Sequence, residues 1–148
     1  MPLLIGGFGN LLIPLMICSS DMIFPRLNAL SLWLVIDSIF IIIWSILIDG
    51  GVNAGWTFYV PLSFINYYSI DMMFFSLHII GLSSILGSIN FIVSILKSCD
   101  LSLFIYYLYI PLFPWSIFVT SLLLIISLPV LAACITMVIF EDLILLYV

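Results

Sequence analysis

The first 33 residues, MPLLIGGFGNLLIPLMICSSDMIFPRLNALSLW (Met1–Trp33), place an acid, a base and an amide between two strongly apolar runs. The acid is Asp21, the base is Arg26, and the amide of Asn28 follows two residues later. Apolar runs of this kind form helices in a bilayer, and charged groups gather where a helix leaves it. The stretch therefore predicts two membrane helices joined by a short polar connection.

The whole chain of 148 residues has the composition of a membrane protein, with 66% hydrophobic and only 6% charged residues. A soluble domain of this composition would have almost no polar surface to face water. The formal net charge of -5 comes from seven acids and two bases, so a cluster of lysines and arginines for nucleic acid is excluded. The three cysteines are far apart in the sequence and are expected to pack as small apolar side chains.

Four apolar segments meet or approach the roughly 20 residues that a helix needs to cross a bilayer. They predict an all-α fold, a polytopic membrane helix bundle of about four transmembrane helices in a single membrane domain over residues 1–148. The first segment is shorter than the others, so we expect a partial span. The predicted spans run over residues 2–18, 30–48, 70–96 and 111–140.

The two bases predict the orientation of these spans. Arg26 and Lys97 lie in the first and third predicted connections, which four alternating helices place on one side of the membrane. Positive charge marks the inner side. We therefore expect the connection that contains Asp21 to face the matrix or the cytoplasm.

Polar residues recur every seven residues within two of the spans. Seven residues is nearly two helical turns, so each set lies on one face of its helix. Two interpretations remain open: the small residues let helices pack closely and bond to each other, or their hydroxyls line a water-bearing groove. The first set is Ser31, Ser38 and Ser45, and the second is Ser69, Ser76, Ser83 and Asn90, with Ser84 beside it.

Single polar residues allow further interpretations. Spacing alone favours an ion pair between Asp21 and Arg26, and a proton-collecting carboxylate is the alternative. Trp56 is typical of an aromatic belt at the membrane interface. His78 is expected to be a neutral, hydrogen-bonded residue and not a metal ligand.

Asp37 lies at membrane depth, where a carboxylate costs about 2.5–3.5 kcal/mol on insertion scales. Its side chain should therefore face protein or water, or be protonated. Its position one residue before Ser38 makes it a candidate extra polar group beside the pathway that such a groove would form.

Five stretches, in order, resemble subunit I of the haem-copper oxidases, in the branch that oxidises cytochrome c in mitochondria. They begin and end inside the span of that family. The resemblance therefore implies part of a twelve-helix fold, carried by a separately translated fragment of a split subunit I. The first stretch is Met1–Trp33, and the others are Gly55–Leu62 (GWTFYVPL), Ser76–Phe91 (SLHIIGLSSILGSINF), Pro111–Ser116 (PLFPWS) and Ser127–Met137 (SLPVLAACITM).

The resemblance also implies an enzyme, of which this chain alone would not be catalytic. The whole oxidase would oxidise cytochrome c, reduce oxygen to water and pump protons. Haem a, haem a3 and copper B would sit in the assembled subunit, with their ligands supplied by other chains. The implied partners are the remaining fragments of subunit I, subunits II and III, cytochrome c and the lipid membrane. The implied location is the mitochondrial inner membrane, with a bacterial plasma membrane as the alternative.

In the family, the matching residues conduct protons along the D-pathway. By resemblance Asp21 is the entrance, Asn10 and Asn28 are the neck, and Ser31 is a hydroxyl above the neck. Trp56 matches a tryptophan whose indole N–H points to a haem propionate. Asp37 stands where the family usually has proline. Ser83 and Ser84 match later water-holding steps, and Ser69 and Ser76 fall on hydroxyl positions.

Two alternatives stay open on the sequence. One is a small membrane transporter or channel subunit, in which the serine sets line a substrate route. The other is a purely structural oxidase fragment that carries no protons.

Overall fold

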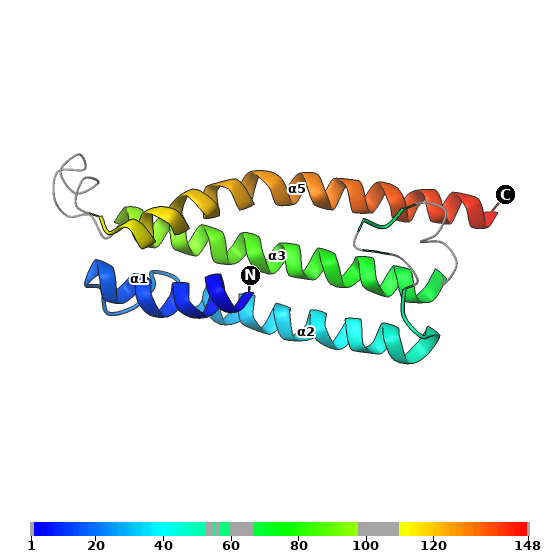
Figure 1. Ribbon diagram of the computed structural model, residues 1–148, viewed down its shortest axis with the longest axis horizontal. Coiled ribbons are helices and arrows are strands. Elements are labelled where there is room, and N and C mark those ends of the chain that lie inside the picture. Colours follow the sequence, from blue (N-terminus) through cyan, green and yellow to red (C-terminus); the bar gives the residue numbers. More distant parts are fainter. Residues whose placement is uncertain (1, 53–54, 56, 60–66, 98–109, 148) are drawn as a thin grey trace. The chain divides into compact units, whose positions relative to one another are not determined.

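The computed structural model describes residues 2–52, 55, 57–59, 67–97 and 110–147, which form helices and no strand (Figure 1). The predicted all-α fold is thereby confirmed over these residues. Three helices contain stretches long and apolar enough to cross a membrane. The elements are a π-helix η1 (Pro2–Gly9) that leads into α1 (Asn10–Ile17), followed by α2 (Pro25–Asp49), α3 (Tyr67–Lys97) and α5 (Leu112–Tyr147).

Helix α2 begins at Pro25, five residues before the predicted span. Proline suits the first position of a helix, because its missing N–H would have no intrahelical acceptor there. The carbonyl of Phe24 accepts the first helical bond, from the N–H of Asn28 at 3.1 Å. Arg26 and Asn28 therefore lie in the first turn of a helix and not in the connection.

The ends of α1 and α2 are set by residues with positive φ. Cys18 closes α1 with φ 57°, and its N–H donates to the carbonyl of Pro14. The N–H of Ser19 reaches the same carbonyl at 3.0 Å. After α2, Gly50 and Gly51 have φ 74° and 88°, which glycine adopts without a steric cost. Both turns stop their helices within one residue of the predicted ends.

The described residues form two compact units. The first unit comprises residues 1–31 and 84–127, and the second comprises residues 32–83 and 128–148. Helices α2, α3 and α5 contribute residues to both units. The single membrane domain expected over residues 1–148 stays a prediction.

Each unit has its own apolar core. In the first unit Gly9 allows a close approach, since a Cβ atom there would lie 3.1 Å from Cζ of Phe91. In the second unit the rings of Phe58 and Phe74 pack at 5.2 Å between centroids. The first core is formed by Ile13, Met22, Phe91, Ile95 and Ile117, and the second by Ile70, Phe74 and Ile135.

Candidate functional site

An amide pair joins α1 to the first turn of α2 within the first unit. Nδ2 of Asn10 donates to Oδ1 of Asn28 over 3.0 Å and to the carbonyl oxygen of Gly6 over 2.6 Å. Oδ1 of Asn10 is buried and has no hydrogen-bond partner among the described residues. An unsatisfied buried acceptor costs about 1–3 kcal/mol, so this atom calls for a donor such as an ordered water.

The hydroxyl of Ser31 extends the amide pair by one turn of α2. Ser31 is half-buried, and its Oγ donates to the carbonyl of Asn28 over 2.8 Å. The structure thus brings together three of the residues predicted from the sequence, Asn10, Asn28 and Ser31. All three are uncharged and can both donate and accept hydrogen bonds, which is the chemistry that holds water molecules in a row.

Asn90 and Ser94 of α3 hold the connection between α1 and α2. Oδ1 of Asn90 accepts from the N–H of Phe24 at 3.2 Å, and its Nδ2 donates to the carbonyl of Phe24 at 3.3 Å. Oγ of Ser94 accepts from the N–H of Ile23 at 3.2 Å. These bonds satisfy two backbone donors just before the helix, where no intrahelical acceptor is available.

The sequence placed Asn90 in a polar set but assigned it no role, and it did not single out Ser94. The two residues are four apart, so they lie on the same side of α3. That spacing, next to a connection that needs partners for its N–H groups, is the signal that could have identified both. Asn90 is 1% exposed and Ser94 is 7% exposed, so the bonds are shielded from water.

Asp21 lies in the connection that these bonds hold, and its side chain is exposed. Within the described part of the chain it makes no hydrogen bond and no ion pair, with Arg26 or any other residue. Arg26 is also exposed. The carboxylate is therefore open to solvent, and the structure does not bring it into contact with the amide pair.

The predicted serines of α3 are mostly buried. Ser69, Ser76 and Ser83 are at most 5% exposed, and Ser84 is half-buried. Oγ of Ser69 donates to the carbonyl of Ser45 on α2 over 3.2 Å, which joins the two helices in the second unit. Oγ of Ser76 donates to Met73 of its own helix over 2.7 Å. These hydroxyls therefore face protein and not the outer surface of the chain.

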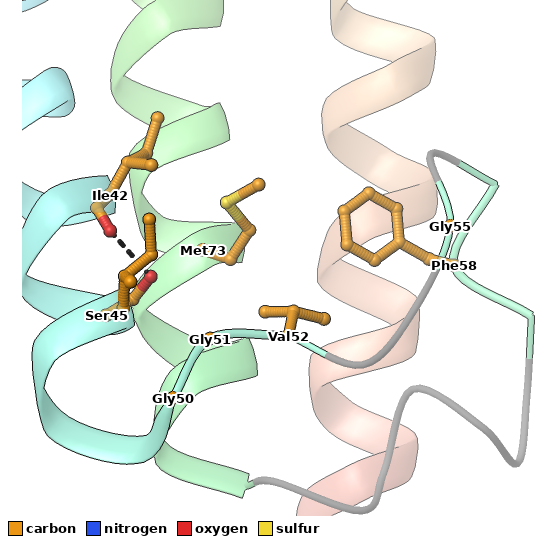
Figure 2. Close-up of a pocket in the computed structure, with 9 residues that line it drawn as sticks. Ile42, Ser45, Gly50, Gly51, Val52, Gly55, Phe58 and Met73 are labelled. Carbon is orange, nitrogen blue, oxygen red and sulfur yellow. Dashed lines mark hydrogen bonds between the residues drawn. The ribbon is translucent and has the colours of Figure 1, made fainter.

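A cavity of about 460 Å³ lies in the second unit where α2 ends. Figure 2 shows Phe58, Met73 and Val52 around it. The side chain of Ser45 also lines the cavity, and its hydroxyl donates to the carbonyl of Ile42 over 2.8 Å. The predicted Trp56 lies outside the described residues.

The histidine and the acids of the described residues are dispersed. His78 is half-buried on α3. Across the described ranges, no group of three or more His, Cys, Asp or Glu side chains is placed to hold a metal ion.

Comparison with known proteins gives consistent matches over nearly the whole chain. Residues 1–147 match the family model described as Cytochrome C and Quinol oxidase polypeptide I. The chain is 47% identical over 144 residues to cytochrome c oxidase subunit 1 of Yarrowia lipolytica, and 44% identical over 144 residues to that of Candida albicans. It is also 47% identical over 145 residues to the same subunit of the scallop Pecten maximus. Each alignment covers 95% of this chain but only 26–30% of the relative.

Proposed function

Because the chain belongs to the cytochrome c and quinol oxidase polypeptide I family, we propose that it serves as one piece of the catalytic subunit of a cytochrome c oxidase. The assembled enzyme would oxidise cytochrome c, reduce oxygen to water and pump protons. The identity of 44–47% to cytochrome c oxidase subunit 1 supports this function. Since the chain spans less than a third of those relatives, other chains would supply the rest of the subunit, together with subunits II and III.

The proposed location is the mitochondrial inner membrane, with the Asp21 connection on the matrix side. Fungal and mollusc relatives support the mitochondrial type. The start of α2 and the end of α3 are joined by the bonds of Asn90 and Ser94, so Arg26 and Lys97 belong to one end of the first unit. Positive residues favour the inner side, which supports this orientation.

The family implies haem a, haem a3 and copper B in the assembled subunit. Histidine is the usual ligand of such haem iron and copper centres. This chain has one histidine, His78, which is half-buried on a single helix. The residues present do not fit a haem or copper site, so the ligands would come from other chains. Trp56 remains a candidate donor to a haem propionate.

The observation that supports a proton-conducting role is the amide pair with its unsatisfied oxygen. A water bound to Oδ1 of Asn10 would lie beside Asn28, and Ser31 continues the polar groups along α2. Water is the natural donor for a buried acceptor of this kind. We propose that Asp21 collects protons from solvent and that Asn10, Asn28 and Ser31 hold the first waters of the route. Its later hydroxyl positions would be Ser69, Ser76, Ser83 and Ser84.

Replacing the carboxylate tests this route directly. In the purified assembly reconstituted into vesicles, Asp21→Asn should slow oxygen reduction or abolish proton pumping, because an amide does not take up and release protons near neutral pH. Asp21→Glu keeps the carboxylate and should retain pumping. Glu141→Gln removes an exposed carboxylate from α5 and serves as the matched control for charge. If Asp21→Asn keeps both the normal rate of oxygen reduction and the normal ratio of pumped protons to electrons, the chain has a scaffold role only.

A second experiment tests membership of the assembly. The complex is purified through a tag on this chain, and its absorption spectrum is recorded. Haem a bands are expected, and the chains that purify with it should carry the histidines that this chain lacks. A haem-free complex would contradict the proposed function, and a full-length subunit I in the complex would contradict the role of a separate piece.

A further inference from the structure

Helix α2 carries a carboxylate in the middle of its membrane span. Asp37 lies twelve residues after Pro25 and eleven before Ile48, the ends of the span. At 1.5 Å per residue it is about 18 Å from one end and about 16 Å from the other. The hydrocarbon core of a bilayer is roughly 30 Å thick, so Asp37 belongs near its midplane.

The side chain of Asp37 faces away from the buried serines of this chain. Ser38, the next residue, is 0% exposed, whereas Asp37 is exposed. Neighbouring residues of a helix point about 100° apart, which explains the difference. Within the described residues Asp37 makes no hydrogen bond or ion pair. Its role as an extra polar group beside the proton pathway stays a prediction.

Asp37 shares its face of α2 with four large apolar side chains. Their exposed fractions are 64% for Trp33, 65% for Phe40, 60% for Trp44 and 70% for Leu47. The spacing alternates between four and three residues, the pattern of a seam between packed helices. We call these five residues the Asp37 face; all of them belong to the second unit.

Lipid can cover the apolar members of this face but not the carboxylate. A charged group at the bilayer centre is costly, and such groups pair with one another in membrane proteins. A second copy of this chain cannot place a lysine or arginine opposite Asp37, because Arg26 and Lys97 lie at or beyond the ends of the spans.

We propose that the Asp37 face packs against a transmembrane helix of a different chain that carries a lysine, arginine or histidine opposite Asp37. The pairing removes the carboxylate from lipid, while the two tryptophans and Phe40 supply apolar contact area along the same seam. The inference rests on the proposed function only in taking the partner from the same assembly, and it does not depend on the proton route.

Photo-crosslinking in the intact assembly identifies the neighbour of this face. A crosslinking phenylalanine analogue is placed at position 40, on the face, and separately at position 39. Ile39 is also exposed, at 49%, but points about 100° away from Phe40 around α2, so it is the matched control. The position 40 probe should capture a membrane segment with a basic residue within one turn of the crosslinked site. Capture of lipid alone, of a second copy, or of a helix without a base would overturn the proposal.

Substitutions at Asp37 then test the charge pair. Asp37→Leu makes the span more apolar, so membrane insertion should be retained while the crosslinked product from position 40 falls about tenfold, as loss of about 1.4 kcal/mol predicts. Asp37→Lys should lower it at least as far, and replacing the partner's base with glutamate in that variant should restore it. An unchanged product in Asp37→Leu would refute the pair. Proton pumping that depends on Asp21 would be unaffected by that result, so the two proposals fail separately.

Discussion

The side-chain amide of Asn10 donates to the side-chain oxygen of Asn28 across 3.0 Å, which ties the start of α1 to the first turn of α2. The second N–H of the same amide is engaged by the carbonyl of Gly6. With both donors used, the orientation of the amide is fixed, and its oxygen is left as an acceptor in a buried position. The bond between the two amides therefore holds α1 to α2, while the oxygen of Asn10 can still accept a hydrogen bond from a water molecule.

A double-mutant cycle separates these two parts. Asn10→Ala and Asn28→Ala should each destabilise the chain, and their coupling should be about 0.5–1.5 kcal/mol, the usual net contribution of a hydrogen bond. SDS titration of the full chain in mixed micelles measures the coupling. Asn10→Ala should also slow proton uptake in the assembly. A coupling near zero would mean that the amides do not bond to each other in the membrane.

Removing the anchor on α3 should loosen the Asp21 connection. Asn90→Ala leaves the N–H and carbonyl of Phe24 without their side-chain partner, and should cost about 1–3 kcal/mol. Ser94→Ala removes the acceptor of Ile23 and should cost less, because one bond is lost instead of two. Hydrogen exchange at the amides of Ile23 and Phe24 should rise in both variants. Ser127→Ala, which alters an exposed hydroxyl, should leave that exchange as it is.

Gly9 and Gly7 should respond differently to an added methyl group. A Cβ atom at Gly9 would lie 3.1 Å from Phe91 and 3.4 Å from Ile117, both buried in the first core. Gly9→Ala should therefore destabilise the chain by about 1 kcal/mol or more. Nothing lies within 4 Å of the same atom at Gly7, where alanine should be neutral or stabilising by up to about 1 kcal/mol. The same SDS titration compares the two, and equal effects would contradict the close approach.

Substitutions at Ser76 test whether its hydroxyl takes part in proton uptake or only packs between helices. Its bond runs to Met73 of its own helix, so Ser76→Ala should change stability by less than about 1 kcal/mol. If the hydroxyl holds water in the proposed route, the same variant should slow proton uptake in the assembly. Ser76→Leu should destabilise by about 1–3 kcal/mol, because the site is 0% exposed and has no room. Unchanged proton uptake in Ser76→Ala would remove this residue from the route.

The existence of the helices followed from the sequence because apolar length is a strong signal in a bilayer protein. The start of α2 did not, since the polarity of Arg26 and Asn28 predicts a connection and not a helix. Pro25 was the better guide: it fixes a helical φ and needs no acceptor. Local backbone chemistry therefore outweighed side-chain polarity at this boundary.

Within the candidate site, periodicity indicated which residues share a face but not what they contact. Asn10 and Asn28 are 18 positions apart, and their bond depends on how α2 runs back along α1 after the turn at Cys18. The role of Asn90 depends on a contact 66 positions distant. Asp37 shows the same limit, because its neighbour Ser38 is buried while it faces outward.

The bonds from Ile23 and Phe24 to α3 impose an order on biogenesis. Their partners, Ser94 and Asn90, leave the ribosome 71 and 66 residues later. During synthesis the first hairpin enters the membrane before these two N–H groups have their partners on α3, so the side-chain bonds that hold the peptide carrying Asp21 are not yet made. A nascent chain that stops within α3 before Asn90 would therefore contain Asp21 but not the bonds that hold its connection in place. The proposed proton uptake site becomes a defined place only after α3 has been translated.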